Sequence, residues 1–342
     1  MNNLYAFGIG IGTKNNTGEW LEVFYPEPML APSDELAAIL VACLGSHNGD
    51  IEPSQEALAA LISALLQNGY NQLAETVTAL KASSKPVVAI MLSTDAAPLS
   101  VPQGYLKLHL LSHRLVKPHQ TNISGIFGVL KNIAWTNVGA IDIKELPDRV
   151  LAARIQGTPL QVDCVDKFPK MVDYIVPTGV RIADTSRVRL GAYVGEGTTV
   201  MHEGFINFNA GTEGPAMIEG RISAGVMVGA NSDLGGGCST MGTLSGGGKQ
   251  VISVGENCLI GANAGIGIPL ANGCVVEAGL YVTAGTKVQL LNAQGELKRN
   301  CKAMDLVGHE GLLFRRNSLS GAVECLPLQS EVELNEELHA HN

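Results

Sequence analysis

The feature that most constrains this chain is an aliphatic residue that returns every six positions between about residues 174 and 290. A six-residue period fits neither an α-helix, with about 3.6 residues per turn, nor a strand, with about two. It is typical of a coil of short parallel strands, in which each repeat forms one flat side and its aliphatic side chain points inward. The repeats fall into four runs: Ile182, Val188, Val194, Val200 and Ile206; Ile222, Val228 and Leu234; Val254, Ile260 and Ile266; and Val276, Val282 and Val288.

Glycine follows many of these aliphatic residues directly, as in Val194-Gly195, Val228-Gly229 and Ile260-Gly261. Glycine tolerates backbone angles that β-branched residues resist. We therefore expect these glycines to help the chain turn at the corners of the coil.

Two segments interrupt the period, 209–215 between Ile206 and Ile222, and 243–250 between Leu234 and Val254. Insertions in a coil of this kind emerge as loops at a corner, often on the binding face. We expect the chemistry of the protein near these two segments.

The rest of the chain differs in character, which predicts three domains. Residues 1–170 predict a mixed α/β domain, with capped helices after Ser33 and Ser54 and a buried strand at 87–92. Residues 174–290 form the coil, and 291–342 a short C-terminal segment. The leucine spacing favours a helix over 105–116, although a strand also fits part of it.

His109 and His113 would share one face of the helix expected at 105–116, as a pair of metal ligands would. The simpler interpretation is that they are surface or hydrogen-bonded histidines, and we prefer it.

Composition excludes several function classes. The net charge of −9 argues against a nucleic-acid partner, since phosphate binding needs a basic face. Seven cysteines, an odd number without CxxC spacing, argue against a zinc site or a disulfide framework. No signal peptide and no membrane span are visible. We expect a reduced, cytoplasmic protein without a membrane partner.

Six blocks in order resemble the long form of the tetrahydrodipicolinate N-succinyltransferases, within the hexapeptide-repeat acyltransferases. The resemblance extends from about residue 105 to 325, whereas residues 1–100 match only loosely. The blocks are 105–115 (YLKLHLLSHRL), 165–174 (VDKFPKMVDY), 201–205 (MHEGF), 219–225 (EGRISAG), 241–248 (MGTLSGGG) and 314–318 (FRRNS).

The resemblance implies a mainly β protein with a left-handed parallel β-helix, assembled as a homotrimer with active sites between neighbouring subunits. It also implies transfer of a succinyl group from succinyl-CoA to tetrahydrodipicolinate, in lysine and diaminopimelate biosynthesis. The fold leaves open an N-acetyltransferase that uses acetyl-CoA, and a non-catalytic trimeric scaffold. A γ-type carbonic anhydrase would need three histidines around zinc, and the coil contains only His202.

By the same resemblance, Glu219 matches the catalytic carboxylate of the family and the backbone N–H of Gly242 matches the oxyanion donor. Glu219 is a base candidate, because partial burial raises the pKa of a carboxylate. A nucleophile that forms an acyl anhydride is the alternative role. The sequence leaves both roles open.

The remaining site residues are also implied by the resemblance. Cations and backbone N–H groups suit the phosphates of CoA. The residues expected to line the succinyl-CoA groove are Arg221, Gly236, Ser239, Ala262, Glu277, Ala278, Gly285, Lys302, Arg315, Arg316, Asn317 and Ser318.

Glu203 matches a carboxylate that gathers around a structural Mg²⁺ on the threefold axis in the family. The usual aspartate partner falls at Ser186 here, and Asp184 lies two residues upstream. This departure removes one expected carboxylate from the metal site, and hard cations require several carboxylate oxygens.

Overall fold

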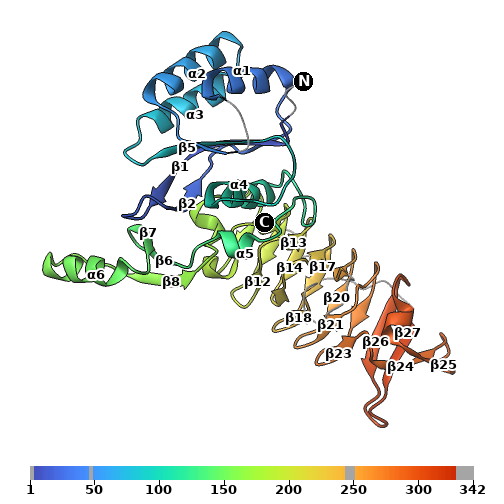
Figure 1. Ribbon diagram of the computed structural model, residues 1–342. Helices are drawn as coiled ribbons and strands as arrows, with labels where there is room; N and C mark the ends of the chain where they lie inside the picture. The colour runs from blue at the N-terminus through green and yellow to red at the C-terminus, as the bar shows by residue number, and fades with distance from the viewer. Residues whose placement is uncertain (1–3, 46–48, 243–250, 329–342) are drawn as a thin grey trace. The chain divides into compact units, whose positions relative to one another are not determined.

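The computed structural model describes residues 4–45, 49–242 and 251–328, and the chain divides into two compact units (Figure 1). The first unit contains Met1–Val116 and Gln120–Pro169, and the second contains Lys117–His119 and Lys170–Asn342.

The first unit is built on an antiparallel sheet with strand order β2-β1-β5-β4, in which β3 also pairs with β1. The strands are β1 (Ala6–Lys14), β2 (Trp20–Phe24), β3 (Met29–Leu30), β4 (Asp50–Ile51) and β5 (Val87–Leu92). Its longer helices are α1 (Asp34–Leu44), α2 (Gln55–Gln67), α3 (Asn71–Lys81) and α4 (Val101–Ser112). The predicted strand at 87–92 is confirmed as β5.

The two predicted helix caps are confirmed. The Ser33 hydroxyl accepts a hydrogen bond from the N–H of Leu36 at 3.2 Å, and α1 begins at the next residue. The Ser54 hydroxyl does the same for Ala57 at 3.2 Å, at the start of α2. Each serine satisfies a backbone donor that the first turn of a helix leaves unpaired.

Strand β1 presents a different surface to each side of the sheet. Phe7 and Ile9 pack into the apolar core with helices α1, α2 and α3. Gly8, between them, faces the other way, and a Cβ at Gly8 would lie 2.7 Å from Leu106 of α4. The missing side chain therefore lets α4 pack closely on the face opposite α1–α3 (Figure 1).

Helix α4 is buried along its whole length, which explains why a single apolar stripe did not define it. It begins and ends about four residues earlier than the leucine spacing predicted, because Ser100 caps its start and Pro102 occupies its first turn. Even Lys107 is fully buried, where its ammonium pairs with Asp95 at 2.5 Å.

The preferred interpretation of the paired histidines is confirmed for His109, whose ring is fully buried and hydrogen-bonded. Its Nδ1 bonds to the carbonyl oxygen of Tyr105 at 2.8 Å, and its Nε2 accepts the N–H of Tyr25 at 3.3 Å. The ring of His113 stacks on it with centroids 5.9 Å apart. Within the described ranges, no group of three or more His, Cys, Asp or Glu residues is arranged to hold a metal ion.

A three-stranded antiparallel sheet completes the first unit, in the order β7-β6-β8. The strands of this sheet are β6 (Ile133–Thr136), β7 (Gly139–Asp142) and β8 (Val162–Asp166). Helix α5 (Ile126–Val129) precedes β6, and helix α6 (Leu146–Ile155) connects β7 to β8. The place of this sheet beside the first sheet is stabilised by polar contacts such as that of Asn15 with Asp142, at 2.9 Å.

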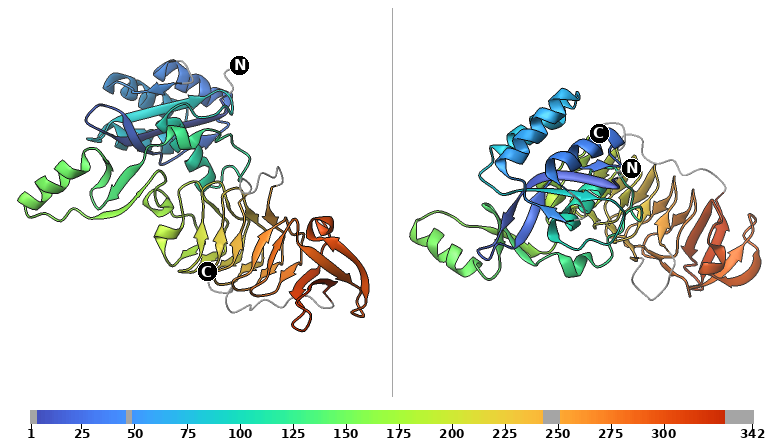
Figure 2. Two further views of the ribbon diagram at one scale, coloured as in Figure 1. Left: turned by 60° about the horizontal axis from the view of Figure 1, so that its bottom comes forward. Right: turned by 45° about the horizontal axis from the view of Figure 1, so that its top comes forward.

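The second unit is a parallel β-helix with three faces, whose short strands stack along it (Figure 2). Face 1 contains β9 (Arg181–Ile182), β11 (Thr198–Val200), β14 (Ala216–Ile218), β17 (Ser232–Leu234), β20 (Leu259–Ile260) and β22 (Val275–Val276). Face 2 contains β12 (Phe205–Ile206), β15 (Arg221–Ile222), β18 (Ser239–Thr240), β21 (Gly265–Gly267) and β23 (Tyr281–Thr283). Face 3 contains β10 (Tyr193–Val194), β13 (Gly211–Thr212), β16 (Met227–Val228) and β19 (Ser253–Val254). Short 3₁₀ turns lie at Met171–Asp173, Thr185–Arg187 and Ala303–Leu306.

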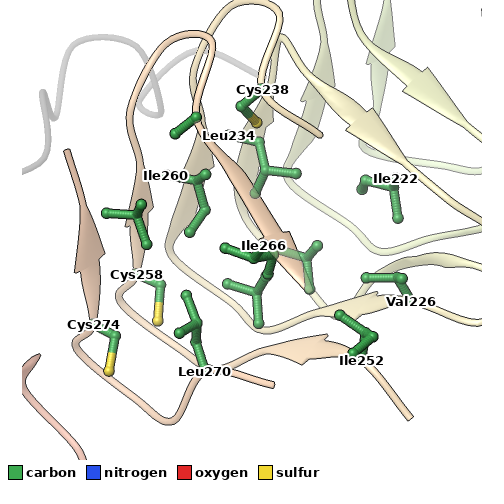
Figure 3. Packing of buried hydrophobic residues seen from close by; sticks show 14 of the residues in the cluster. Ile222, Val226, Leu234, Cys238, Ile252, Cys258, Ile260, Ile266, Leu270 and Cys274 are labelled. Carbon is green, nitrogen blue, oxygen red and sulfur yellow. The ribbon is translucent and has the colours of Figure 1, made fainter. Parts of the chain in front are cut away.

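The inward residues of the sequence period meet in register across coils, as the period predicts. On face 1, Ile218 pairs with Leu234, Leu234 with Ile260, and Ile260 with Val276. These side chains are fully buried and form one continuous apolar core, part of which Figure 3 shows. Burial of one such side chain stabilises the fold by about 1.5–3 kcal/mol.

The predicted loop at 209–215 is wrong, because this segment is part of a regular coil. Thr212 takes the inward position on face 3, where it is fully buried and its hydroxyl bonds to that of Thr198 at 2.8 Å. Because its inward residue is polar, this repeat does not show in the aliphatic six-residue period. The second predicted loop, 243–250, lies outside the described residues.

The phase slip has a different cause, which is a short corner. The inward residue of face 1 is followed by that of face 2 after six positions in the coils of Val200, Leu234, Ile260 and Val276. In one coil the step is only four, from Ile218 to Ile222. The corner between them contains Glu219 and Gly220.

The glycines that directly follow inward residues serve close packing, which corrects the role expected from the sequence. A Cβ on Gly261 would lie 2.4 Å from the backbone nitrogen of Ala278 in the next coil. The turning residue comes two positions later and has positive φ, a conformation that suits glycine and asparagine. Such residues are Gly191, Gly197, Asn209, Gly225, Asn231, Gly237, Asn257, Asn263, Gly273 and Gly279.

The C-terminal segment leaves the six-residue period and then returns to the β-helix. The departure begins with β24 (Lys287–Leu291), at the end of the predicted coil, and the further strands are β25 (Leu297–Lys302), β26 (Leu312–Arg316) and β27 (Val323–Pro327). Strand β26 pairs in parallel with β22, so that the buried Phe314 continues face 1 after Val276. In the part of the chain that the structure describes, no helix is long and apolar enough to cross a membrane.

The paired histidines predict that the free energy of unfolding falls in acid. Burial lowers the pKa of His109 to about 3 and that of His113 to about 4, from an ordinary value of about 6.5. The unfolded chain then binds more protons than the folded one between these values. The contribution of these histidines to the free energy of unfolding is therefore fully present above about pH 6.5. It decreases as the pH is lowered, by about 1.4 kcal/mol per histidine at pH 5.5.

Denaturant titrations at pH 7.5 and 5.5 measure this loss. The variant His109→Gln is expected to lose about half of the dependence. Equal midpoints at both pH values for the unaltered protein would contradict the assignment.

Candidate active site

One edge of the β-helix, where the chain turns from face 1 to face 2, is a ladder of backbone hydrogen bonds; we name it edge 1–2. The N–H that follows each inward residue of face 1 donates to the next coil. The bonds join Glu219 to Leu234 at 2.8 Å, Gly235 to Ile260 at 2.8 Å, Gly261 to Val276 at 2.8 Å and Glu277 to Phe314 at 2.9 Å.

Edge 1–2 brings together most of the predicted site residues, although they are far apart in the sequence. Ala262 and Ala278 are exposed, and Gly236 is half-buried. Side chains this small allow a ligand to approach the backbone closely. The predicted residues on this edge are Glu219, Gly236, Ala262, Glu277, Ala278, Arg315, Arg316, Asn317 and Ser318.

The end of edge 1–2 has two arginines held by carboxylates. The Nε of Arg315 donates to Glu324 at 2.9 Å, and the backbone N–H of Arg316 donates to Glu277 at 2.6 Å. Asn317 donates to Glu324 at 2.8 Å. This hydrogen bond and the Arg315 ion pair outweigh burial and hold the pKa of Glu324 below its usual range.

Glu219 is half-buried at the short corner, and the next coil holds its backbone in place. Its N–H donates to Leu234, and its carbonyl oxygen accepts the N–H of Gly237 at 3.3 Å. Its carboxylate lies beside Gly236, where Oε2 would be 3.4 Å from an added Cβ. The structure therefore places the predicted catalytic carboxylate next to a residue predicted to bind succinyl-CoA.

Face 2 carries two further predicted residues, Arg221 and Ser239, which pair across adjacent strands. The guanidinium of Arg221 donates to the hydroxyl of Ser239 at 2.5 Å. Arg221 is exposed and Ser239 is buried. Both residues begin their strands on face 2, directly after edge 1–2.

The predicted residues Gly242, Gly285 and Lys302 lie elsewhere, along the edge where face 2 turns to face 3. Gly242 follows β18 and Gly285 follows β23, each after its strand has crossed face 2. Lys302 pairs with Lys287 of β24, two residues beyond Gly285. Within one chain, Glu219 and Gly242 thus lie at opposite edges of the same face.

Glu203 is two-thirds exposed, and its carboxylate approaches His202 at 3.7 Å. Ser186, at the position where the resemblance implies an aspartate, donates its hydroxyl to Asp184 at 2.6 Å. Asp184 is therefore engaged locally. Among the described residues of one chain, this region holds no group of three or more His, Cys, Asp or Glu that could bind a metal ion, so a single chain does not by itself fit a hard cation.

The sequence prediction missed Tyr281, which lies on the outer surface of face 2. Its ring covers Gly265, because a Cβ at Gly265 would be 2.1 Å from Tyr281 Cε1. The side chain is half-exposed, and Gly265 lies between Tyr281 and Ser239 in the strand order of face 2. An aromatic residue directly before an inward valine was the available signal.

The segment Lys117–His119 was also missed as part of the β-helix unit. Lys117 pairs with Glu213 at 2.8 Å, and Nε2 of His119 bonds to the carbonyl oxygen of Gly225 at 2.8 Å. Its sequence has no six-residue period, so that only the fold reveals the contact.

Two family models match the chain. One is described as the middle of tetrahydrodipicolinate N-succinyltransferase and matches residues 130–170. The other is described as the hexapeptide repeat of succinyl-transferase and matches residues 251–284.

The chain is also similar to curated relatives along its full length. A 2,3,4,5-tetrahydropyridine-2,6-dicarboxylate N-succinyltransferase from Pseudomonas putida is 61% identical, over 100% of this chain and 99% of the relative. The protein of that name from Vibrio cholerae is 59% identical, over 99% of each chain.

Among solved structures, a putative 2,3,4,5-tetrahydropyridine-2-carboxylate N-succinyltransferase from Campylobacter jejuni has a TM-score of 0.89 and is 33% identical. The match covers 96% of this chain and 94% of that one.

The end of edge 1–2 predicts that Arg315→Gln weakens binding of CoA. Loss of one charge-assisted hydrogen bond costs about 1.5–3 kcal/mol, or roughly 10- to 100-fold in Kd. Calorimetric titration with CoA measures the change.

Two controls accompany this variant. Lys298→Gln removes an exposed cation from β25 and should leave the Kd unchanged, which excludes a general charge effect. Arg315→Gln with Glu324→Gln removes the buried carboxylate that the single variant leaves without its arginine. Unaltered affinity in both arginine variants would show that Arg315 does not contact CoA.

Proposed function

Since the chain belongs to the tetrahydrodipicolinate N-succinyltransferase family, we propose that edge 1–2 is where it transfers a succinyl group from succinyl-CoA to tetrahydrodipicolinate. The chain is thus an acyltransferase whose product is N-succinyl-2-amino-6-oxopimelate, with CoA released. The observation that carries the proposed location is the alignment of Glu219, Gly236, Ala262, Ala278 and residues 315–318 along one edge.

The reaction needs a base, an oxyanion donor and a long surface for the cofactor. The acceptor nitrogen attacks the thioester carbonyl, the oxyanion forms and collapses, and the CoA thiolate leaves with the C–S bond broken. Water first adds across the C=N bond of the acceptor and gives a cyclic carbinolamine, whose N–H nitrogen is the attacking group. After acylation the hydroxyl of the carbinolamine loses its proton, the ring C–N bond breaks, and the open-chain ketone forms. Each proton removed from nitrogen or from the hydrate needs a base, and the half-buried Glu219 is the carboxylate beside the proposed cofactor edge.

The alternative role of Glu219 is a nucleophile that accepts the succinyl group as an acyl anhydride and then passes it to nitrogen. Both roles need the carboxylate beside the thioester. Its position next to Gly236 supports either.

The cofactor contacts are proposed from charge and size. Arg221, Lys302, Arg315 and Arg316 supply cations for phosphate and carboxylate groups, and Gly236, Ala262 and Ala278 give access to the backbone. Ser239, Glu277, Gly285, Asn317 and Ser318 complete the proposed set. We add Tyr281, whose half-exposed ring lies on the same face.

The separation of Glu219 and Gly242 supports a site shared between subunits. Because the two residues lie at opposite edges of face 2, a neighbouring subunit would have to bring a second edge to Glu219. We therefore retain the homotrimer, with the N–H of Gly242 as the oxyanion donor across that interface.

Further sequence expectations remain proposals. These are the left-handed sense of the β-helix, the domain limits 1–170, 174–290 and 291–342, the cytoplasmic location and a structural Mg²⁺. Any such ion would need Glu203 from three subunits, and no step of the reaction passes through it.

Thiol release from succinyl-CoA tests the function. With tetrahydrodipicolinate present, the full-length protein should release CoA rapidly from succinyl-CoA and slowly from acetyl-CoA. Preference for acetyl-CoA would change the donor, and release independent of tetrahydrodipicolinate would remove the acceptor from the proposal.

Glu219→Gln should bind CoA normally and lower kcat by about 10²- to 10⁴-fold, the range expected for a lost general base. Stopped-flow thiol release and CoA titration measure the two quantities. Glu256→Gln, at a corner between faces 3 and 1, is the matched control and should keep normal turnover. Near-normal kcat in Glu219→Gln would remove the residue from the mechanism.

A further inference from the structure

The corner that carries Glu219 differs from the corner of the next coil on edge 1–2 in two ways. It contains two residues fewer than the corner of the next coil, and it lacks a turning residue with positive φ, which Gly237 provides in that next coil. Glu219 therefore lies on a short connection between Ile218 and Ile222, which is hydrogen-bonded to the coil beside it.

That next coil fixes the short corner at three backbone points. The N–H of Glu219 bonds to Leu234, the carbonyl oxygen of Glu219 bonds to Gly237, and the N–H of Arg221 bonds to the carbonyl oxygen of Cys238 at 2.8 Å. All three partners lie within the single segment from Leu234 to Cys238. A shift of this segment is passed directly to Glu219.

Cys238 fills the space beneath the short corner. A regular corner places a buried inward side chain four positions after the inward residue of face 1, as Cys238, Ala264 and Leu280 do. The short corner has no such residue. Instead, the Sγ of Cys238 lies against Gly220, where an added Cβ would be 2.3 Å from Sγ and 2.7 Å from the Cys238 carbonyl oxygen.

The environment of Cys238 keeps its thiol uncharged. The residue is 1% exposed, and burial, with a smaller contribution from the charge of Glu219, raises the pKa of the thiol to about 12. A neutral side chain of this size supports the corner without adding a second negative charge next to the carboxylate.

We propose that Cys238 is a positioning residue for Glu219, holding the catalytic carboxylate in place through its contact with Gly220. The proposal rests on the proposed role of Glu219 in succinyl transfer. It assigns Cys238 no contact with substrate, and its effect is on the placement of a reacting group.

The chain offers a matched control in Cys258. It is also a buried inward cysteine of the same core, but it lies at a corner between faces 3 and 1, beside Cys274 (Figure 3). Its Sγ contacts the carbonyl oxygen of Ala271 at 3.2 Å, away from edge 1–2. Burial raises the pKa of this thiol as well, to about 11.

The first experiment compares Cys238→Val with Cys258→Val. Valine already occupies an equivalent corner position at Val226, so that both variants are expected to fold, with similar falls in Tm. Cys238→Val should lower kcat by roughly 10- to 100-fold, as a displacement of about 1 Å at a reacting group does. Its Kd for CoA should not change, and Cys258→Val should keep both values.

The second experiment tests the contact itself with a double-mutant cycle. Gly220→Ala places a methyl group against Sγ and should lower kcat strongly. Cys238→Ala in the same chain removes Sγ and should restore part of the loss, so that the two effects are not additive.

The proposal is overturned if Cys238→Val keeps the kcat of the unaltered enzyme, if Cys258→Val loses as much, or if the Gly220 and Cys238 effects add. Failure of the proposed function is distinguishable, because the unaltered enzyme would then release no CoA. Hydrogen exchange at 219–221 supplies a readout that needs no turnover. Faster exchange in Cys238→Val, but not in Cys258→Val, is expected, and equal exchange would contradict the positioning role.

Discussion

The structure of the second unit depends on one arrangement, the in-register stacking of inward side chains held by parallel backbone hydrogen bonds. Each coil donates to and accepts from the next, and each inward residue lies on its equivalents, as Leu234 lies between Ile218 and Ile260. Neither the hydrogen bonds nor the apolar core is complete within one coil. Stability is therefore a property of neighbouring coils together.

The same arrangement explains how a site arises on an edge. Residues that follow an inward position are brought into line at a spacing set by the hydrogen bonds, whatever their separation in the sequence. Arg315 is 96 residues from Glu219 in the chain, yet both follow an inward residue of face 1. A long cofactor matches a linear site of this kind, and the short corner of Glu219 is where edge 1–2 departs from the six-residue repeat.

Much of the β-helix could be predicted from the sequence, because a six-residue aliphatic period matches neither a helix nor a simple strand. The short corner could not, since Thr212 is polar and the aliphatic period therefore predicts an inserted loop in place of its repeat. The glycine positions were predicted for the wrong reason, because the period does not reveal how closely the next backbone approaches. The site residues of edge 1–2 were predicted from a family resemblance. That resemblance did not include Tyr281 or Cys238, whose contacts are made only between neighbouring coils.

The most direct test of a cofactor site on edge 1–2 is a crystal structure of the protein with CoA bound. We predict density for the pantetheine arm along edge 1–2, with its sulfur beside Glu219 and Gly236 and its phosphates towards Arg315 and Arg316. Density along the edge between faces 3 and 1, beside Cys258 and Cys274, would contradict this location.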